Sequence, residues 1–114
     1  MKYLLLIHVD EAHYPRLSAQ ETERLMGDYQ EFTRQLKAAG AHIASQRLRP
    51  VASATTVRVR NGETLVSDGP FAEMKEQLGG FYLIDANDLD EAIAWAAKLP
   101  SAKHGSIEVR PVWE

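Results

Sequence analysis

An Asp-Gly-Pro turn lies just past the middle of the chain. Asp68 at its start is the first candidate catalytic side chain. The dipeptide Asn61-Gly62 predicts a two-residue hairpin turn, which pairs Thr55 with Asp68. Because side chains alternate between strand faces, Asp68 shares its face with the valines Val57, Val59 and Val66. Burial there would favour the neutral carboxyl, which suits a general acid or base. The alternative is an Asx-turn acceptor for the backbone amides after Gly69-Pro70.

The loop after this turn alternates in charge and ends in two glycines, so it is the second candidate site. Its charges could hold a polar ligand, its aromatic ring could stand at a pocket mouth, and a glycine lets a ligand approach the backbone. The alternatives are a solvated loop, a ring anchored in the core and a plain β-bulge. We predict ligand contacts from Phe71, Glu73, Lys75, Glu76 and Gly79.

His8 closes the first apolar stretch, and a histidine beside Asp68 would complete an acid–base pair. We therefore predict His8 and Asp68 as catalytic residues, with a hydrogen-bonded strand-end imidazole as the alternative for His8. No two histidines have HxH or HxxxH spacing, and the chain has no cysteine. The sequence therefore predicts no metal site, and it excludes a disulfide or a cysteine nucleophile.

Four arginines form a basic cluster around the hairpin: Arg47, Arg49, Arg58 and Arg60. Arg58 and Arg60 lie on the hairpin face opposite Asp68, where they could meet a carboxylate substrate or a partner protein. The alternative is a solvated face on which Arg60 stands opposite Glu63.

Composition narrows the classes of function. At 114 residues and 45% hydrophobic content, the chain predicts one domain, residues 1–114, with its own core. The net charge of −3, with basic residues scattered among acidic ones, argues against a duplex-binding surface, which needs a basic stripe, and we predict no direct nucleic-acid binding. The longest apolar run, Tyr3–Val9, is too short to span a membrane and has no cleavage site, so we predict a cytoplasmic protein. No phosphate loop or nucleotide fingerprint is present, and we predict no cofactor.

Periodicity and capping residues predict two helices and six strands. Ser18 and Glu21 form a capping box at the start of the first helix, and Gly40 is suited to its end. Asp88 caps the second helix, which Pro100 stops. The predicted strands are Tyr3–Val9, His42–Ser45, Thr55–Arg60, Glu63–Asp68, Gly80–Asp85 and Ile107–Trp113.

The order β-α-β, inserted hairpin, β-α-β predicts a ferredoxin-like α+β sandwich, in which the helices cover one face of the sheet. Both faces of the central strands are apolar, however, since Tyr3, Leu5 and Ile7 alternate with Leu4 and Leu6. A second copy of the chain would cover the remaining face. We therefore predict a homodimer in which two sheets pack face to face as a dimeric α+β barrel.

The run from Ser67 to Tyr82 resembles the signature of the YCII-related family, in particular its DGPF branch. The resemblance covers nearly the whole chain and includes Met1–Ile7, Ala54–Arg58, Leu89–Ala92 and Ile107–Pro111. Within the signature, Met74 stands where many relatives carry threonine, so a hydroxyl is absent at that loop position. The resemblance independently implies the dimeric α+β barrel.

That class of fold includes decarboxylases, isomerases, cofactor-free monooxygenases and haem enzymes, and a His–Asp pair has been proposed in the wider YCII family. The resemblance also suggests an association with extracytoplasmic-function sigma factors. Two functions follow as expectations. One is a cofactor-independent enzyme that binds a small molecule and uses Asp68 as general acid or base. The other is a non-catalytic ligand-binding or regulatory module associated with a sigma factor.

Overall fold

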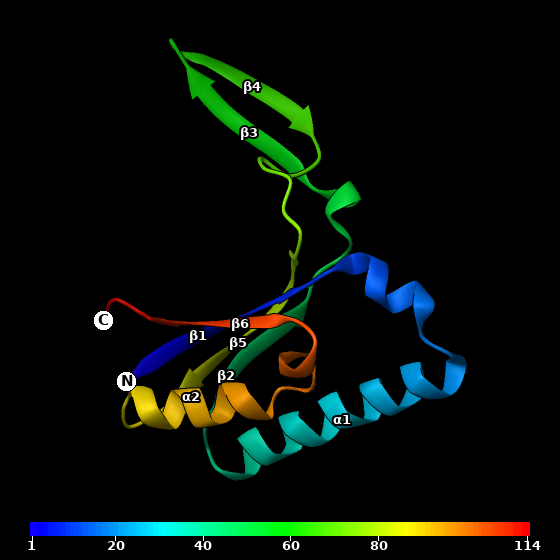
Figure 1. Cartoon of the computed structure of the whole chain (residues 1–114). Coiled ribbons are helices and arrows are strands. Elements are labelled where there is room, and N and C mark those ends of the chain that lie inside the picture. The colour runs from blue at the N-terminus through cyan, green and yellow to red at the C-terminus, as the bar shows by residue number, and fades with distance from the viewer.

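The computed structural model describes the whole chain, residues 1–114, as an α+β fold (Figure 1). Two α-helices, α1 (Ala19–Ala38) and α2 (Leu89–Lys98), lie on one side of a four-stranded antiparallel sheet, and a separate two-stranded hairpin projects away from it. The strands are β1 (Lys2–Val9), β2 (His42–Arg47), β3 (Thr55–Arg60), β4 (Glu63–Asp68), β5 (Gln77–Asp85) and β6 (Ser106–Pro111). The sequence did not predict three short 3-10 helices, η1 (Glu11–Arg16), η2 (Val51–Ser53) and η3 (Pro100–Lys103).

The sheet has the strand order β2-β5-β1-β6, with every neighbouring pair antiparallel. Strand β5 lies between β1 and β2, and β1 lies between β5 and β6, so each β-α-β unit is split by a strand of the other. This order is consistent with the predicted ferredoxin-like sandwich.

The hydrophobic core lies between the sheet and the two helices. Alternate residues of β1, from Tyr3 to Val9, are buried, whereas Leu4, Leu6 and His8 are only partly covered. The buried side chains of the sheet pack against Phe32, Leu36, Ala92 and Ala96 of the helices. On the other side, the open sheet face carries four partly exposed apolar side chains, Leu4, Leu6, Phe81 and Leu83, and no helix lies over it (Figure 1).

The predicted helix caps are confirmed. The Ser18 backbone N–H donates to the Glu21 carboxylate at 3.0 Å, and the Glu21 N–H donates to Ser18 Oγ at 3.1 Å, which completes the capping box. After α1, Gly40 has φ of +71°, and the N–H of Ala41 donates to the Leu36 carbonyl at 2.9 Å. These contacts form a Schellman ending, which favours glycine because an L side chain is strained at that φ.

Two β-bulges change which side chains share a face. Between β1 and β5, Ile7 pairs with Gly80 and His8 pairs with Leu78, so Gly79 is the extra residue. The bulge alternative for Gly79 is therefore realised. Between β2 and β5, the register shifts between His42 and Ala44, which leaves Ile43 as the extra residue.

The predicted hairpin register is also confirmed. Thr55 pairs with Asp68, and Val57 pairs with Val66. Asn61 and Gly62 both have positive φ, at 51° and 78°, as a primed two-residue turn requires. The hairpin β3–β4 forms its own two-stranded sheet and rises on the side of the open sheet face (Figure 1).

Candidate functional site

A pocket of about 500 Å³ opens between the sheet and the N-terminal half of α1. We call it the helix-side pocket. Strands β1, β2 and β5 form its floor, while η1 and α1 form its wall. Its lining consists of Ile7, Tyr14, Thr22, Leu25, Met26, Tyr29, Ser45, Gln46, Arg47, Gly79, Gly80, Phe81 and Tyr82.

The polar floor of this pocket includes Ser45, whose Oγ lies 2.8 Å from Nε2 of His42. Burial, with a smaller effect from the charge of Lys37, lowers the pKa of His42. A neutral imidazole is therefore favoured beside the Ser45 hydroxyl, and a neutral imidazole can accept a proton. This pair gives the helix-side pocket a candidate base with a hydroxyl directed by it.

Two tyrosines of the pocket lining, one in the wall and one in the floor, have hydrogen-bonded hydroxyls. Tyr29 is hydrogen-bonded to the buried Ser101, and the Tyr82 hydroxyl lies 2.7 Å from Oγ1 of Thr33. Burial raises the pKa of Tyr29 to about 12, so its phenol remains neutral at physiological pH. These bonds tie α1 to the sheet and to η3, which fixes the shape of the pocket.

A second, wider hollow of about 590 Å³ lies at the end of β1 on the opposite face of the sheet. We call it the sheet-face hollow. Its lining consists of His8, Met74, Lys75, Glu76, Ser106, Ile107 and Glu108. It brings together three residues that the sequence singled out, namely His8, Lys75 and Glu76. Glu76 is fixed there because its carboxylate accepts a hydrogen bond from the Ser106 hydroxyl at 2.7 Å.

The acidic partner of His8 is Glu108. Their Nε2 and Oε1 atoms are 3.6 Å apart, and Nε2 is buried without a hydrogen bond. Glu108 is also ion-paired with Arg110 along the same strand. An unpaired buried nitrogen is costly, so His8 is poised to take a hydrogen bond from a ligand, a solvent molecule or a second chain.

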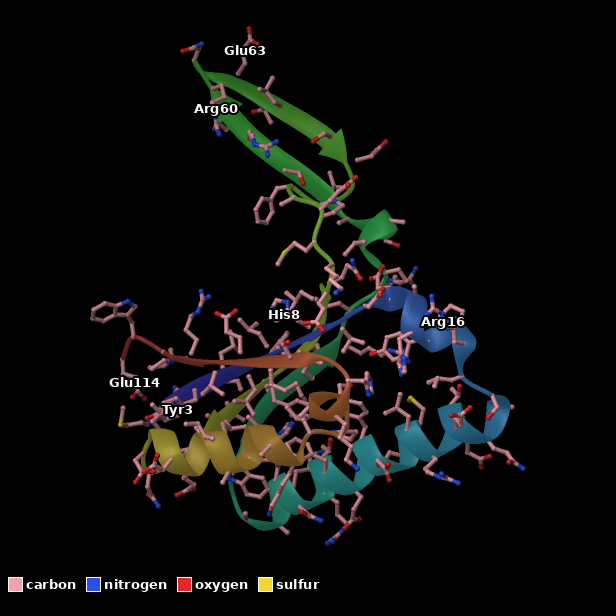
Figure 2. All side chains as sticks on the ribbon, in the orientation of Figure 1. Tyr3, His8, Arg16, Arg60, Glu63 and Glu114 are labelled. Carbon is pink, nitrogen blue, oxygen red and sulfur yellow. The ribbon has the colours of Figure 1, made fainter.

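The structure does not bring His8 and Asp68 together in one chain. Asp68 is exposed at the end of β4, lines neither hollow, and makes no hydrogen bond or ion pair with His8. Figure 2 shows His8 at the sheet, while Arg60 and Glu63 mark the distant tip of the hairpin.

The turn after Asp68 is held by backbone groups. The Gly69 N–H donates to the Ala54 carbonyl at 2.7 Å, and the Thr56 hydroxyl donates to the Gly69 carbonyl at 2.8 Å. The Asp68 carboxylate takes no part in these bonds, so the Asx-turn alternative is not realised in the single chain.

The remaining predicted contacts divide between the two faces of the sheet. Gly79 lines the helix-side pocket beside Gly80. Phe71 is 77% exposed and so is not a core anchor, and Glu73 is exposed. Neither of them reaches either hollow.

Sequence reasoning missed Ser45, Tyr14 and Glu108 as site residues, and it named Arg47 only as a member of the basic cluster around the hairpin. Only Glu108 had a readable signal, because it alternates with the apolar residues Ile107 and Val109 and therefore had to face away from the core. The helix-side set depends on how α1 packs over β2, which no local pattern encodes.

No three His, Asp or Glu side chains gather closely enough to hold a metal ion. No helix combines the length and the apolar character that crossing a membrane would require.

The comparisons with known proteins cover the whole length of the chain. The model of the YCII-related domain matches residues 1–114. An uncharacterized protein of Rhizobium meliloti (strain 1021), R00369, is 46% identical over 114 residues, which cover 98% of this chain and 92% of that protein. The chain therefore belongs to the YCII-related family.

Proposed function

We propose that this protein binds a small molecule in the helix-side pocket. The observation that carries the proposal is the pocket itself, because about 500 Å³ falls within the ~300–1,000 Å³ of typical ligand sites. Its walls are largely apolar, with Leu25, Met26 and Tyr29 on one side, and its polar groups are few. This combination is typical of sites for organic ligands of moderate size.

The lining favours a ligand with an apolar or aromatic body and one anionic group. Arg47 is the only charged side chain among the lining residues, and guanidinium groups bind carboxylates in two-pronged geometry. Ser45 offers a hydroxyl on the same floor. A carboxylate at Arg47 would place the body of the ligand against Leu25 and Met26.

The proposed chemistry at this site is proton transfer. In this step the Ser45 hydroxyl gives its proton to Nε2 of the neutral His42 and takes one from an acidic group of the bound ligand, which leaves an imidazolium and a deprotonated ligand. This step needs no cofactor. Ligand binding without turnover would instead support the non-catalytic module that the sequence left as the alternative.

The active form proposed here is a homodimer with its open sheet faces in contact, as a dimeric α+β barrel. The support is the apolar character of Leu4, Leu6, Phe81 and Leu83 on a face that no helix covers. Packing two such faces would also enclose the sheet-face hollow and cover His8.

The test is a ligand screen by thermal shift and calorimetry with aromatic carboxylates and their neutral amides. Met26→Trp fills the helix-side pocket and should abolish binding while the fold is kept, because Met26 is already partly exposed. The matched control is Met74→Trp, which places the same ring in the sheet-face hollow and should leave affinity unchanged. Equal binding to wild type and Met26→Trp would reject the helix-side pocket as the site.

A further inference from the structure

The hairpin arm, Thr55–Asp68, is not packed on the body of its own chain. Every residue of the arm except Thr56 is exposed, and β3 and β4 are hydrogen-bonded into a sheet only with each other. One face presents Val57, Val59 and Val66, which are 59%, 60% and 65% exposed. A two-stranded hairpin alone is marginally stable in water, so an apolar arm of this kind needs a covering surface.

The exposed area and radius of gyration of the whole chain also indicate that part of its surface is covered by a partner. A compact monomer of 12.8 kDa is expected to expose about 6,300 Å², whereas this chain exposes 8076 Å². The radius of gyration is 16.1 Å, against about 13 Å for a compact chain of this length. The excess area of about 1,800 Å² exceeds the ~800 Å² that each partner buries in a standard stable interface.

We propose that the apolar face of the arm packs on a second copy of this chain. The arm rises on the same side as the open sheet face, so a copy seated on that face lies within the angle between arm and sheet (Figure 1). Under two-fold symmetry each arm then packs on the other protomer. The apolar arm face and the open sheet face are both covered in one closed dimer. The inference extends the sheet-face dimer of the proposed function but depends on a separate surface.

The arm contact would also change the solvent exposure of Asp68. Asp68 lies on the arm face that carries Val57, Val59 and Val66. A second copy that covers these valines also withdraws the Asp68 carboxylate from water. The desolvation that an acid or base at this position requires, absent in the single chain, is then supplied by the partner.

Neighbouring residues on opposite arm faces provide a matched test. Val66→Asp places a carboxylate on the apolar face of the arm, which carries Val57. Leu65→Asp places the same charge on the opposite face, where Leu65 pairs with Arg58. By sedimentation velocity, Val66→Asp should raise the dimer dissociation constant at least about 100-fold, because an unpaired charge enters an apolar contact. Leu65→Asp should change it by less than about 3-fold.

A labelling experiment keeps the test independent of folding defects. The chain has no cysteine, so Val66→Cys and Leu65→Cys each carry a single thiol. In the dimer, the thiol at position 66 should react with a maleimide at least about 10-fold more slowly than the thiol at position 65. On dilution to monomer the two rates should converge.

The outcomes separate the arm from the barrel. A dimer broken by Leu6→Asp on the open sheet face but unaffected by Val66→Asp, with equal labelling at both positions, overturns the arm contact and leaves the barrel standing. A dimer broken only by Val66→Asp supports the arm and rejects sheet-to-sheet packing. A wild-type monomer at micromolar concentration overturns both, while ligand binding in the helix-side pocket is judged separately by Met26→Trp.

Discussion

His42 and Ser45 point to the same side of β2, although Ser45 is the third residue after His42. Strict alternation would place them on opposite faces. The bulge at Ile43 restores the shared face, and the result is a contact of 2.8 Å between His42 Nε2 and Ser45 Oγ. A single inserted residue thus places the His42 imidazole beside the Ser45 hydroxyl, and Ser45 lines the helix-side pocket.

This pair predicts a loss of stability in mild acid. Burial, and then Lys37, lower the pKa of His42 from 6.5, so the unfolded chain binds a proton that the folded chain resists. The free energy of unfolding is therefore retained above the unfolded pKa and falls as pH drops through 6.5 toward the folded value. Urea titrations of wild type and His42→Gln across this range should show a smaller fall in the variant, since glutamine reaches Ser45 without titrating.

The control for this prediction is His104→Gln. The pKa of His104 is also lowered, first by burial and then by His13, so it contributes a fall of the same sign. Its substitution should remove a separate portion of the acid loss, additive with that of His42→Gln. If the fall in stability with acid is the same in His42→Gln as in wild type, the partial burial of His42 does not lower its pKa as assigned here.

Arg47 should decide the charge preference of the pocket. Arg47→Gln is expected to weaken binding of an aromatic carboxylate about 10-fold and to leave its neutral amide unaffected, because only the anion uses the guanidinium. Arg49→Gln makes the same change in charge two residues away, outside the pocket lining, and serves as the control. Calorimetry of wild type and both variants with both ligands measures the six dissociation constants. Equal losses for the two ligands would mean that Arg47 contributes shape rather than charge.

Substitution by alanine should change the free energy of unfolding in opposite directions at two glycines, one inside α1 and one just after its C-terminal end. Gly27 lies inside the helix, and an added Cβ there meets nothing within 4 Å, so Gly27→Ala should raise the free energy of unfolding by about 0.8 kcal/mol. Gly40 has φ of +71°, and Gly40→Ala should lower it by about 1 kcal/mol. Urea denaturation measures both. A stabilising Gly40→Ala would show that the Schellman ending is not maintained in solution.

Much of the fold could be predicted because its signals are local. Ser18 with Glu21, and Asn61 with Gly62, specify a helix start and a hairpin register within a few residues, and the structure has both. The strand ends were less well predicted. For example, β5 begins at Gln77 rather than Gly80 because pairing with β1 continues past the bulge at Gly79.

The site was less accessible to sequence reasoning. Alternation placed Asp68 correctly beside Val57 and Val66 within the hairpin, but it gave no information on whether that face is covered. The bulge at Ile43 reverses the parity on which a facing prediction depends, so the contact of His42 with Ser45 was not readable. Both failures concern relationships between elements, which side-chain periodicity within one element does not encode.

The last prediction distinguishes an acid–base role of Asp68 from an ion pair between subunits. Its carboxylate makes no hydrogen bond in the single chain, so Asp68→Asn should leave the free energy of unfolding within about 0.5 kcal/mol. If the partner desolvates it without pairing it, the neutral amide should tighten the dimer about 5-fold, since an amide is less costly to bury than a carboxylate. Glu63→Gln at the arm tip is the control, and it should leave the free energy of unfolding and the dimer dissociation constant unchanged. A dimer weakened by Asp68→Asn would mean that a cation of the second copy meets this carboxylate. A carboxylate already held in an ion pair is a poor proton acceptor, so that result would assign Asp68 to assembly and leave His42 as the candidate base.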